Sequence, residues 1–180
     1  MKIRTITISF LIAISTLLWT GCGKVGPEGP QGPQGPASSD IISSIWYTPG
    51  ANDWTYDNTV KEWYYDVSNA VTDAEITKDI VENGVVLAYM SSSADHPANS
   101  VRPLPSYAMG CDWNFLIHTY GSIEFTSNAL TNPGSIEVSF RFILIPASVY
   151  LKSTKVKSKS VVELKNMPYQ DVCKMFGIQE

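Results

Sequence analysis

The stretch Ser-Ile-Glu-Val-Ser-Phe-Arg-Phe-Ile-Leu-Ile at residues 135–145 decides the fold class of this chain. Its apolar and polar side chains alternate, and a period of two is the signature of a β-strand with one face in a core. Pro146 follows, and it ends the strand because it has no N–H to continue a sheet ladder. We predict an inner face of Val138, Phe140, Phe142 and Leu144 and an outer face of Glu137, Ser139 and Arg141.

The same alternation recurs through residues 41–180 and predicts one β-rich domain. Further strands are predicted at residues 62–67, 113–118, 41–48, 85–91 and 122–128, with weaker ones at 148–152 and 160–164. Turn-forming triplets, such as Thr48-Pro49-Gly50 and Asn132-Pro133-Gly134, separate these runs. Short strands divided by such turns favour a mainly β fold, and we expect an antiparallel, jelly-roll-like β-sandwich.

Two short helices are expected to interrupt the strands. Thr72 and Glu75 form a capping box ahead of an apolar stripe, and Gly84 supplies a left-handed stop. Pro168 suits the first turn of a second helix, which ends before Gly177. One face of this terminal helix is apolar, so we expect the helix to dock on the sandwich as a lid over one open end. That face consists of Tyr169, Val172, Cys173 and Phe176.

The N-terminus predicts export and a lipid anchor. Residues 1–21 carry Lys2 and Arg4 before an apolar stretch at residues 6–18, which is shorter than the ~20 residues of a membrane span and typical of a signal peptide. The small pair Thr20-Gly21 before Cys22 resembles a bacterial lipobox, in which the cysteine thiol is alkylated with diacylglycerol. Several acyl chains make such an anchor lasting.

A collagen-like tract follows Cys22 in the segment that we assign to residues 22–40. Four Gly-Pro-X triplets occupy residues 26–37. Glycine at every third position suits a triple helix, and proline favours the polyproline II conformation. We therefore expect a semi-rigid spacer of about 37 Å in a monomer, with a trimer through residues 26–37 as the alternative.

The chain resembles a group of collagen-like lipoproteins of Gram-negative bacteria. The resemblance is carried by the signal, Cys22, the Gly-Pro-X tract, the stretch ITKDIVENGVVLAY at residues 76–89, and YQDVCK at residues 169–174 with Gly177-Ile178. It covers nearly the whole chain and implies architecture alone, since the group has no assigned reaction. No catalytic residue is carried over from it.

Cysteines and histidines are the first candidates for chemistry. With Cys22 lipidated, Cys111 and Cys173 remain, and outside the cytoplasm they either form a disulfide or lie as two buried thiols. His96 and His118 invite a hydrolase, but no nucleophile signature accompanies them. Residues 52–58 are rich in oxygen ligands but lack the spacing of a calcium loop. We therefore expect no catalytic site, metal or cofactor.

Exposed aromatic side chains are the first candidates for binding. Trp54 and Tyr56 lie in a polar stretch and predict a platform for a glycan, whereas Trp63 and Trp113 belong to predicted strands and are expected in the core. A lysine run at residues 152–159 suits either an anionic surface or a solvated sheet edge. The net charge of −4 becomes more negative by two when the signal is removed, which argues against nucleic-acid binding.

These features together predict a lipid-anchored envelope protein. Gly23 after the anchor lacks the aspartate of inner-membrane retention, so we expect the outer membrane, on its periplasmic or surface side. The anchored domain is expected to be non-enzymatic, with a binding, adhesive or structural role and a glycan or protein partner. The alternatives are a carbohydrate-binding module that serves glycan uptake and a hydrolase.

Overall fold

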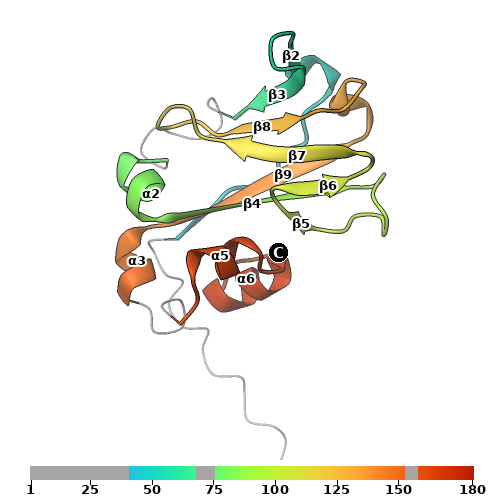
Figure 1. The fold of residues 1–180 in the computed structure, drawn as a ribbon. Helices are drawn as coiled ribbons and strands as arrows, with labels where there is room; N and C mark the ends of the chain where they lie inside the picture. The colour runs from blue at the N-terminus through green and yellow to red at the C-terminus, as the bar shows by residue number, and fades with distance from the viewer. Residues whose placement is uncertain (1–40, 68–75, 153–157) are drawn as a thin grey trace, which may run out of the picture. The chain divides into compact units, whose positions relative to one another are not determined.

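Two antiparallel sheets form the centre of the domain in the computed structural model, which describes residues 41–67, 76–152 and 158–180. Sheet A has the strand order β1-β9-β4-β5, and sheet B has the order β2-β3-β8-β7-β6 (Figure 1). Sheet A consists of β1 (Ile42–Ser43), β9 (Val138–Ile145), β4 (Val85–Ser92) and β5 (Arg102–Pro103). Sheet B consists of β2 (Thr55–Asp57), β3 (Glu62–Asp66), β8 (Glu124–Ser127), β7 (Cys111–Leu116) and β6 (Ser106–Ala108).

The predicted strand at residues 135–145 is confirmed as β9, with a later start. It pairs with β4 along its whole length, from Ser92 opposite Val138 to Val85 opposite Ile145. Its predicted inner face points at sheet B, where the Phe140 ring stacks on Phe125 with 4.4 Å between centroids. Residues from both sheets therefore share one core, which includes Trp113 as predicted, with Trp63 packed at its margin.

The second face of β4 and β9 is also covered, which the alternation did not predict. Val85 and Leu87 of β4 and Ile143 and Ile145 of β9 form a second cluster with the helices α5 (Val161–Lys165) and α6 (Tyr169–Phe176). These helices lie against sheet A on the side away from sheet B (Figure 1). Sheet A is thus a middle layer, and α6 covers a sheet face rather than an open end between the sheets.

Helix α6 forms where its sequence pattern predicted. The four apolar-face residues are all buried, and Pro168 stands at the N-cap. Gly177 adopts φ 66° and donates its N–H to the Cys173 carbonyl, which ends the helix in the left-handed conformation that glycine tolerates best.

Helix α2 (Lys78–Asn83) differs from the prediction at both ends. It begins after Thr77, whose hydroxyl accepts the Ile80 N–H at 3.3 Å, while the predicted capping box of Thr72 and Glu75 lies outside the described residues. Gly84 ends the helix with φ −94°, so the predicted left-handed stop is wrong. Glycine is needed there for space, because a Cβ would lie 2.4 Å from the Ile145 carbonyl oxygen.

Two segments predicted as weak strands are helices. Residues 148–152 belong to α3 (Ala147–Lys152), which follows directly where Pro146 stops β9. In the predicted strand at 160–164, Ser160 is the N-cap of α5 and the other residues belong to that helix. A capping box starts it: the Ser160 hydroxyl accepts the Glu163 N–H, and Glu163 accepts the Ser160 N–H at 2.7 Å. The described domain therefore has more helices than the two predicted.

Two 3₁₀ turns meet at the edge where β2 begins. They are η1 (Ala51–Asp53) and η2 (Pro133–Ser135). A Cβ on Gly134 would lie 2.4 Å from the Ala51 nitrogen, and Asn132 donates its side-chain amide to the Ala51 carbonyl at 2.8 Å. None of the helices in the described part of the chain has the length and apolar character of a membrane span.

Replacing Phe140 tests the shared core. We expect Phe140→Ala to lower the free energy of unfolding by roughly 3–5 kcal/mol, because it leaves a cavity between the two sheets. Ile45→Ala is the control, since Ile45 is 70% exposed and a change there should stay within about 0.5 kcal/mol. Urea unfolding measures both, and equal stability of the two variants would contradict the assignment of the core.

Candidate functional site

The predicted glycan platform of Trp54 and Tyr56 does not form. Trp54 is 5% exposed and packs its ring against Trp113 and Phe140 in the core between the sheets. Tyr56 lies at the sheet edge with its ring 5.0 Å from that of Trp63. Trp54 follows the turn η1 and precedes β2, and its side chain lies in the core between the sheets. Its polar neighbours in the sequence therefore did not indicate that Trp54 itself is exposed.

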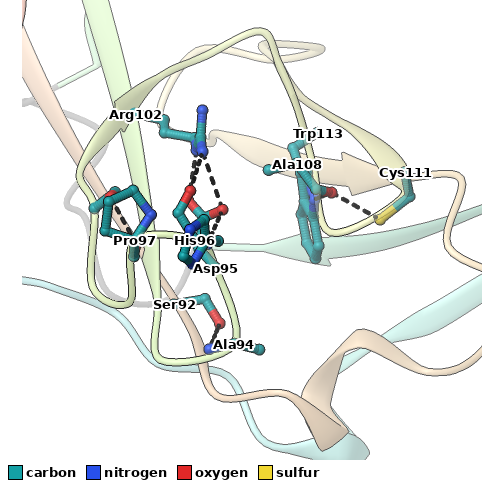
Figure 2. A network of polar contacts seen from close by, with 10 residues as sticks. Ser92, Ala94, Asp95, His96, Pro97, Arg102, Ala108, Cys111 and Trp113 are labelled. Carbon is teal, nitrogen blue, oxygen red and sulfur yellow. Dashed lines mark hydrogen bonds and ion pairs between the residues drawn. The ribbon is translucent and has the colours of Figure 1, made fainter.

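Cys111 and Cys173 are free thiols in the structure, so the disulfide alternative is not formed. Cys111, in β7 of sheet B, belongs to the core between the two sheets. Its Sγ lies 3.6 Å from the Ala108 carbonyl oxygen, which also accepts the Trp113 indole N–H (Figure 2). Cys173 belongs to the cluster under α6, on the opposite face of sheet A. Burial raises the pKa of the Cys173 thiol, so it stays protonated at neutral pH.

Both predicted histidines, His96 and His118, are exposed and lie beside carboxylates. Asp95 faces Arg102, whose guanidinium donates to both carboxylate oxygens at 2.5 and 3.1 Å, and the carboxylate also accepts the His96 backbone N–H (Figure 2). His118 is exposed and pairs with Glu124 at 3.0 Å. In the described ranges, no three His, Cys, Asp or Glu residues converge as metal ligands.

A more distinctive site begins with a β-bulge beside β1. Ser43 lies opposite Ile143, whereas Tyr47 lies opposite Phe140. Between these two pairs the segment advances by four residues and β9 by three, so the segment contains one extra residue. The extra residue inverts the alternation that follows it. Tyr47 therefore points towards sheet B, and Trp46 points to the helix side of sheet A.

Arg141 fills the space that this bulge opens. The side chain is 8% exposed and donates to the Ser44 carbonyl at 2.9 Å, to the Ser43 hydroxyl at 2.8 Å and to the Tyr169 hydroxyl. Its guanidinium carbon lies 6.0 Å from the Trp46 ring centroid and 5.6 Å from that of Tyr169. One cation thus joins β9, the bulge and α6 through hydrogen bonds and two cation–π contacts.

The charge of Arg141 is not neutralised by the groups around it. Burial raises the pKa of Tyr169 to about 12, with a contribution from its hydrogen bond to Cys173, and burial also raises the pKa of Tyr89. Both phenols therefore stay neutral at physiological pH. Among the described residues no carboxylate forms an ion pair with Arg141. Carbonyl and hydroxyl oxygens and aromatic faces carry the stabilisation instead.

An open pocket of about 310 Å³ lies next to this cluster. Trp46 and Tyr169 are two of its walls, so the rings that touch Arg141 also border the pocket. Ser91 of β4 and Ser139 of β9 are paired and also line the pocket. They lie on the same face of sheet A as Arg141, two residues along each strand from the pair of Tyr89 and Arg141. Gln170 and Glu180 contribute polar groups from α6 and the segment after it.

Sequence reasoning missed Trp46 and Arg141, for different reasons. The alternation places Arg141 on the polar face of its strand, although the apolar Ile143 and Ile145 on the same face are a sign of a second covering layer. Trp46 owes its position to the bulge, which has no sequence signal of its own.

Comparisons with known proteins add no assignment to this site. No protein family, no curated protein and no solved structure matches the chain significantly. The chemistry of the site therefore has to be argued from its own residues.

Removing the Arg141 charge tests the link between sheet A and α6. We expect Arg141→Leu to lower the free energy of unfolding by about 1.5–3 kcal/mol, because the Ser44 carbonyl loses a charged donor in a buried position. Hydrogen exchange of the α6 amides should accelerate as well. Lys174→Leu on the exposed side of α6 is the control, and equal exchange in both variants would contradict the link.

Lowering the pH tests the Asp95–Arg102 pair. The hydrogen bonds from Arg102 hold the pKa of Asp95 below its usual range, so its contribution to stability is present above about pH 3.9 and is lost as the pH falls through the lower, folded-state value. We expect urea unfolding between pH 7 and about pH 3 to show a smaller loss of stability for Asp95→Asn than for the unchanged chain. Asp79→Asn, at an exposed position of α2, should follow the unchanged chain.

Proposed function

We propose that this chain is a lipid-anchored envelope protein that presents a non-enzymatic ligand-binding domain. In this proposal the two sheets are a jelly-roll-like β-sandwich, and Cys22 carries the lipid. The domain stands on a spacer formed by residues 22–40 at the outer membrane. The pocket beside Trp46 is the place where a ligand binds.

The pocket between the bulge and α6 is the observation that carries the binding role. Its apolar lining consists of two aromatic side chains and Val101, and its other groups are hydroxyl, amide and carboxylate side chains, which orient a ligand by hydrogen bonds. The Arg141 cluster holds two of the walls in place by buried contacts, so the pocket is formed before a ligand arrives. A preformed pocket costs less free energy to fill than one that must be ordered on binding.

The anchor and the spacer are supported by the sequence. The apolar stretch at residues 6–18 ends close to Cys22, and the Gly-Pro-X tract begins within a few residues of it. A polyproline-type segment of residues 26–37 would hold the domain about 37 Å from its attachment point. That distance would bring the pocket clear of a lipid headgroup layer, where soluble ligands reach it.

Mass spectrometry of the chain from a Gram-negative host tests the anchor. We expect the N-terminal peptide to begin at Cys22 and to carry diacylglycerol and a further acyl chain, and the protein to fractionate with membranes. Cys22→Ser should abolish the lipid and release the chain from the membrane fraction, while Ser38→Ala in the linker should change neither. An unmodified Cys22, or the unchanged protein in the medium, would refute the proposal.

A further inference from the structure

The pocket beside Trp46 combines aromatic side chains with hydroxyl, amide and carboxylate groups. Trp46 is half-buried, and its indole forms a T-shaped pair with the Tyr169 ring, with 5.5 Å between centroids and 64° between the ring planes. Ser91 and Ser139 supply hydroxyls from the sheet, and Gln170 supplies an exposed amide from the first turn of α6. A ligand that fits must therefore present an apolar face to the indole and several hydroxyl-type groups to the floor and mouth.

The charges around the pocket favour a neutral ligand. Arg141 lies directly behind the two aromatic walls without an ion-pair partner among the described residues, and its field disfavours a cation in the pocket. Glu180 also lines the pocket, so a charged ligand of either sign is attracted by one of the two groups and repelled by the other. A neutral molecule meets neither penalty, and its hydroxyls can donate to the carboxylate and the serine oxygens.

The size of the pocket sets the size of the ligand. A volume of about 310 Å³ lies at the small end of the range of about 300–1,000 Å³ for ligand pockets. The pocket is also open to solvent, so a ligand that enters it can extend beyond the mouth. Both features suit one ring of a longer molecule.

We propose that the pocket between Trp46 and α6 binds a neutral sugar residue of a glycan. The apolar face of the sugar ring stacks on the Trp46 indole, and its hydroxyls bond to Ser91, Gln170 and Glu180. Arg141 is a positioning residue, because it holds the Trp46 and Tyr169 rings without touching the sugar. The assignment rests on the proposed binding function and names the ligand class of that same site.

A glycan array probed with the full chain in detergent tests the assignment. The array carries neutral glycans together with glycans that end in acidic and amino sugars. We expect binding to a subset of the neutral glycans. Trp46→Leu keeps the bulk of the apolar contact and removes the flat face, and it should weaken binding at least about tenfold, as loss of an aromatic hot spot does.

Two substitutions on α6 form a matched pair for the same assay. Gln170 and Lys174 are both exposed, but only Gln170 lines the pocket. Gln170→Tyr should fill the mouth and abolish binding, whereas Lys174→Tyr should bind like the unchanged chain. Gln170→Tyr keeps the test decisive if Trp46→Leu fails to fold, because its side chain replaces an exposed one.

Three results would overturn the sugar assignment. They are no binding of the full chain to any neutral glycan, binding confined to acidic or amino sugars, and equal binding by Gln170→Tyr and Lys174→Tyr. None of them bears on the anchor, which the mass of the Cys22 peptide reports separately. A lipidated chain that ignores neutral glycans would therefore refute this inference and leave the envelope proposal standing.

Discussion

The antiparallel pairing of β4 with β9 is the constraint on which the rest of the domain depends. Its register places alternate residues of both strands into two different clusters, one shared with sheet B and one shared with the helices. A slip by one residue would exchange the two sets and point Arg141 into the aromatic core around Phe140. The burial of both faces therefore specifies one register of β4 and β9. Sheet B packs on one of these faces and the helices α5 and α6 pack on the other.

Arg141 links this register to the pocket beside Trp46. The Ser44 carbonyl beside the bulge accepts a hydrogen bond from the guanidinium. The same group reaches the Tyr169 hydroxyl, so the orientation of α6 depends on a strand residue. A hydrophobic side chain would fill this space, but it would take the charged donor away from the carbonyl and the hydroxyl. The pocket owes its two aromatic walls to this arrangement.

Much of the fold could be predicted from local patterns, and the candidate site could not. The alternation around Phe140 and the apolar face of α6 were read correctly, because each depends on periodicity within one segment. Trp54 was misplaced because a turn, and not its polar neighbours, decides which way it points. The segment at 160–164 is helical and not the predicted strand, because Ser160 and Glu163 form a capping box that starts a helix.

The sequence alone determined the longest strands, the proline that ends β9 and the apolar face of α6, and it places an apolar stretch, Cys22 and a Gly-Pro-X tract before the domain. Only the tertiary structure decided that both faces of sheet A are buried, that Cys111 and Cys173 lie in separate clusters, and that Trp46 meets Arg141. The reason is physical. Periodicity tells which side chains share a face, but what covers that face depends on contacts between segments far apart in the chain, and a single bulged residue is enough to redirect them.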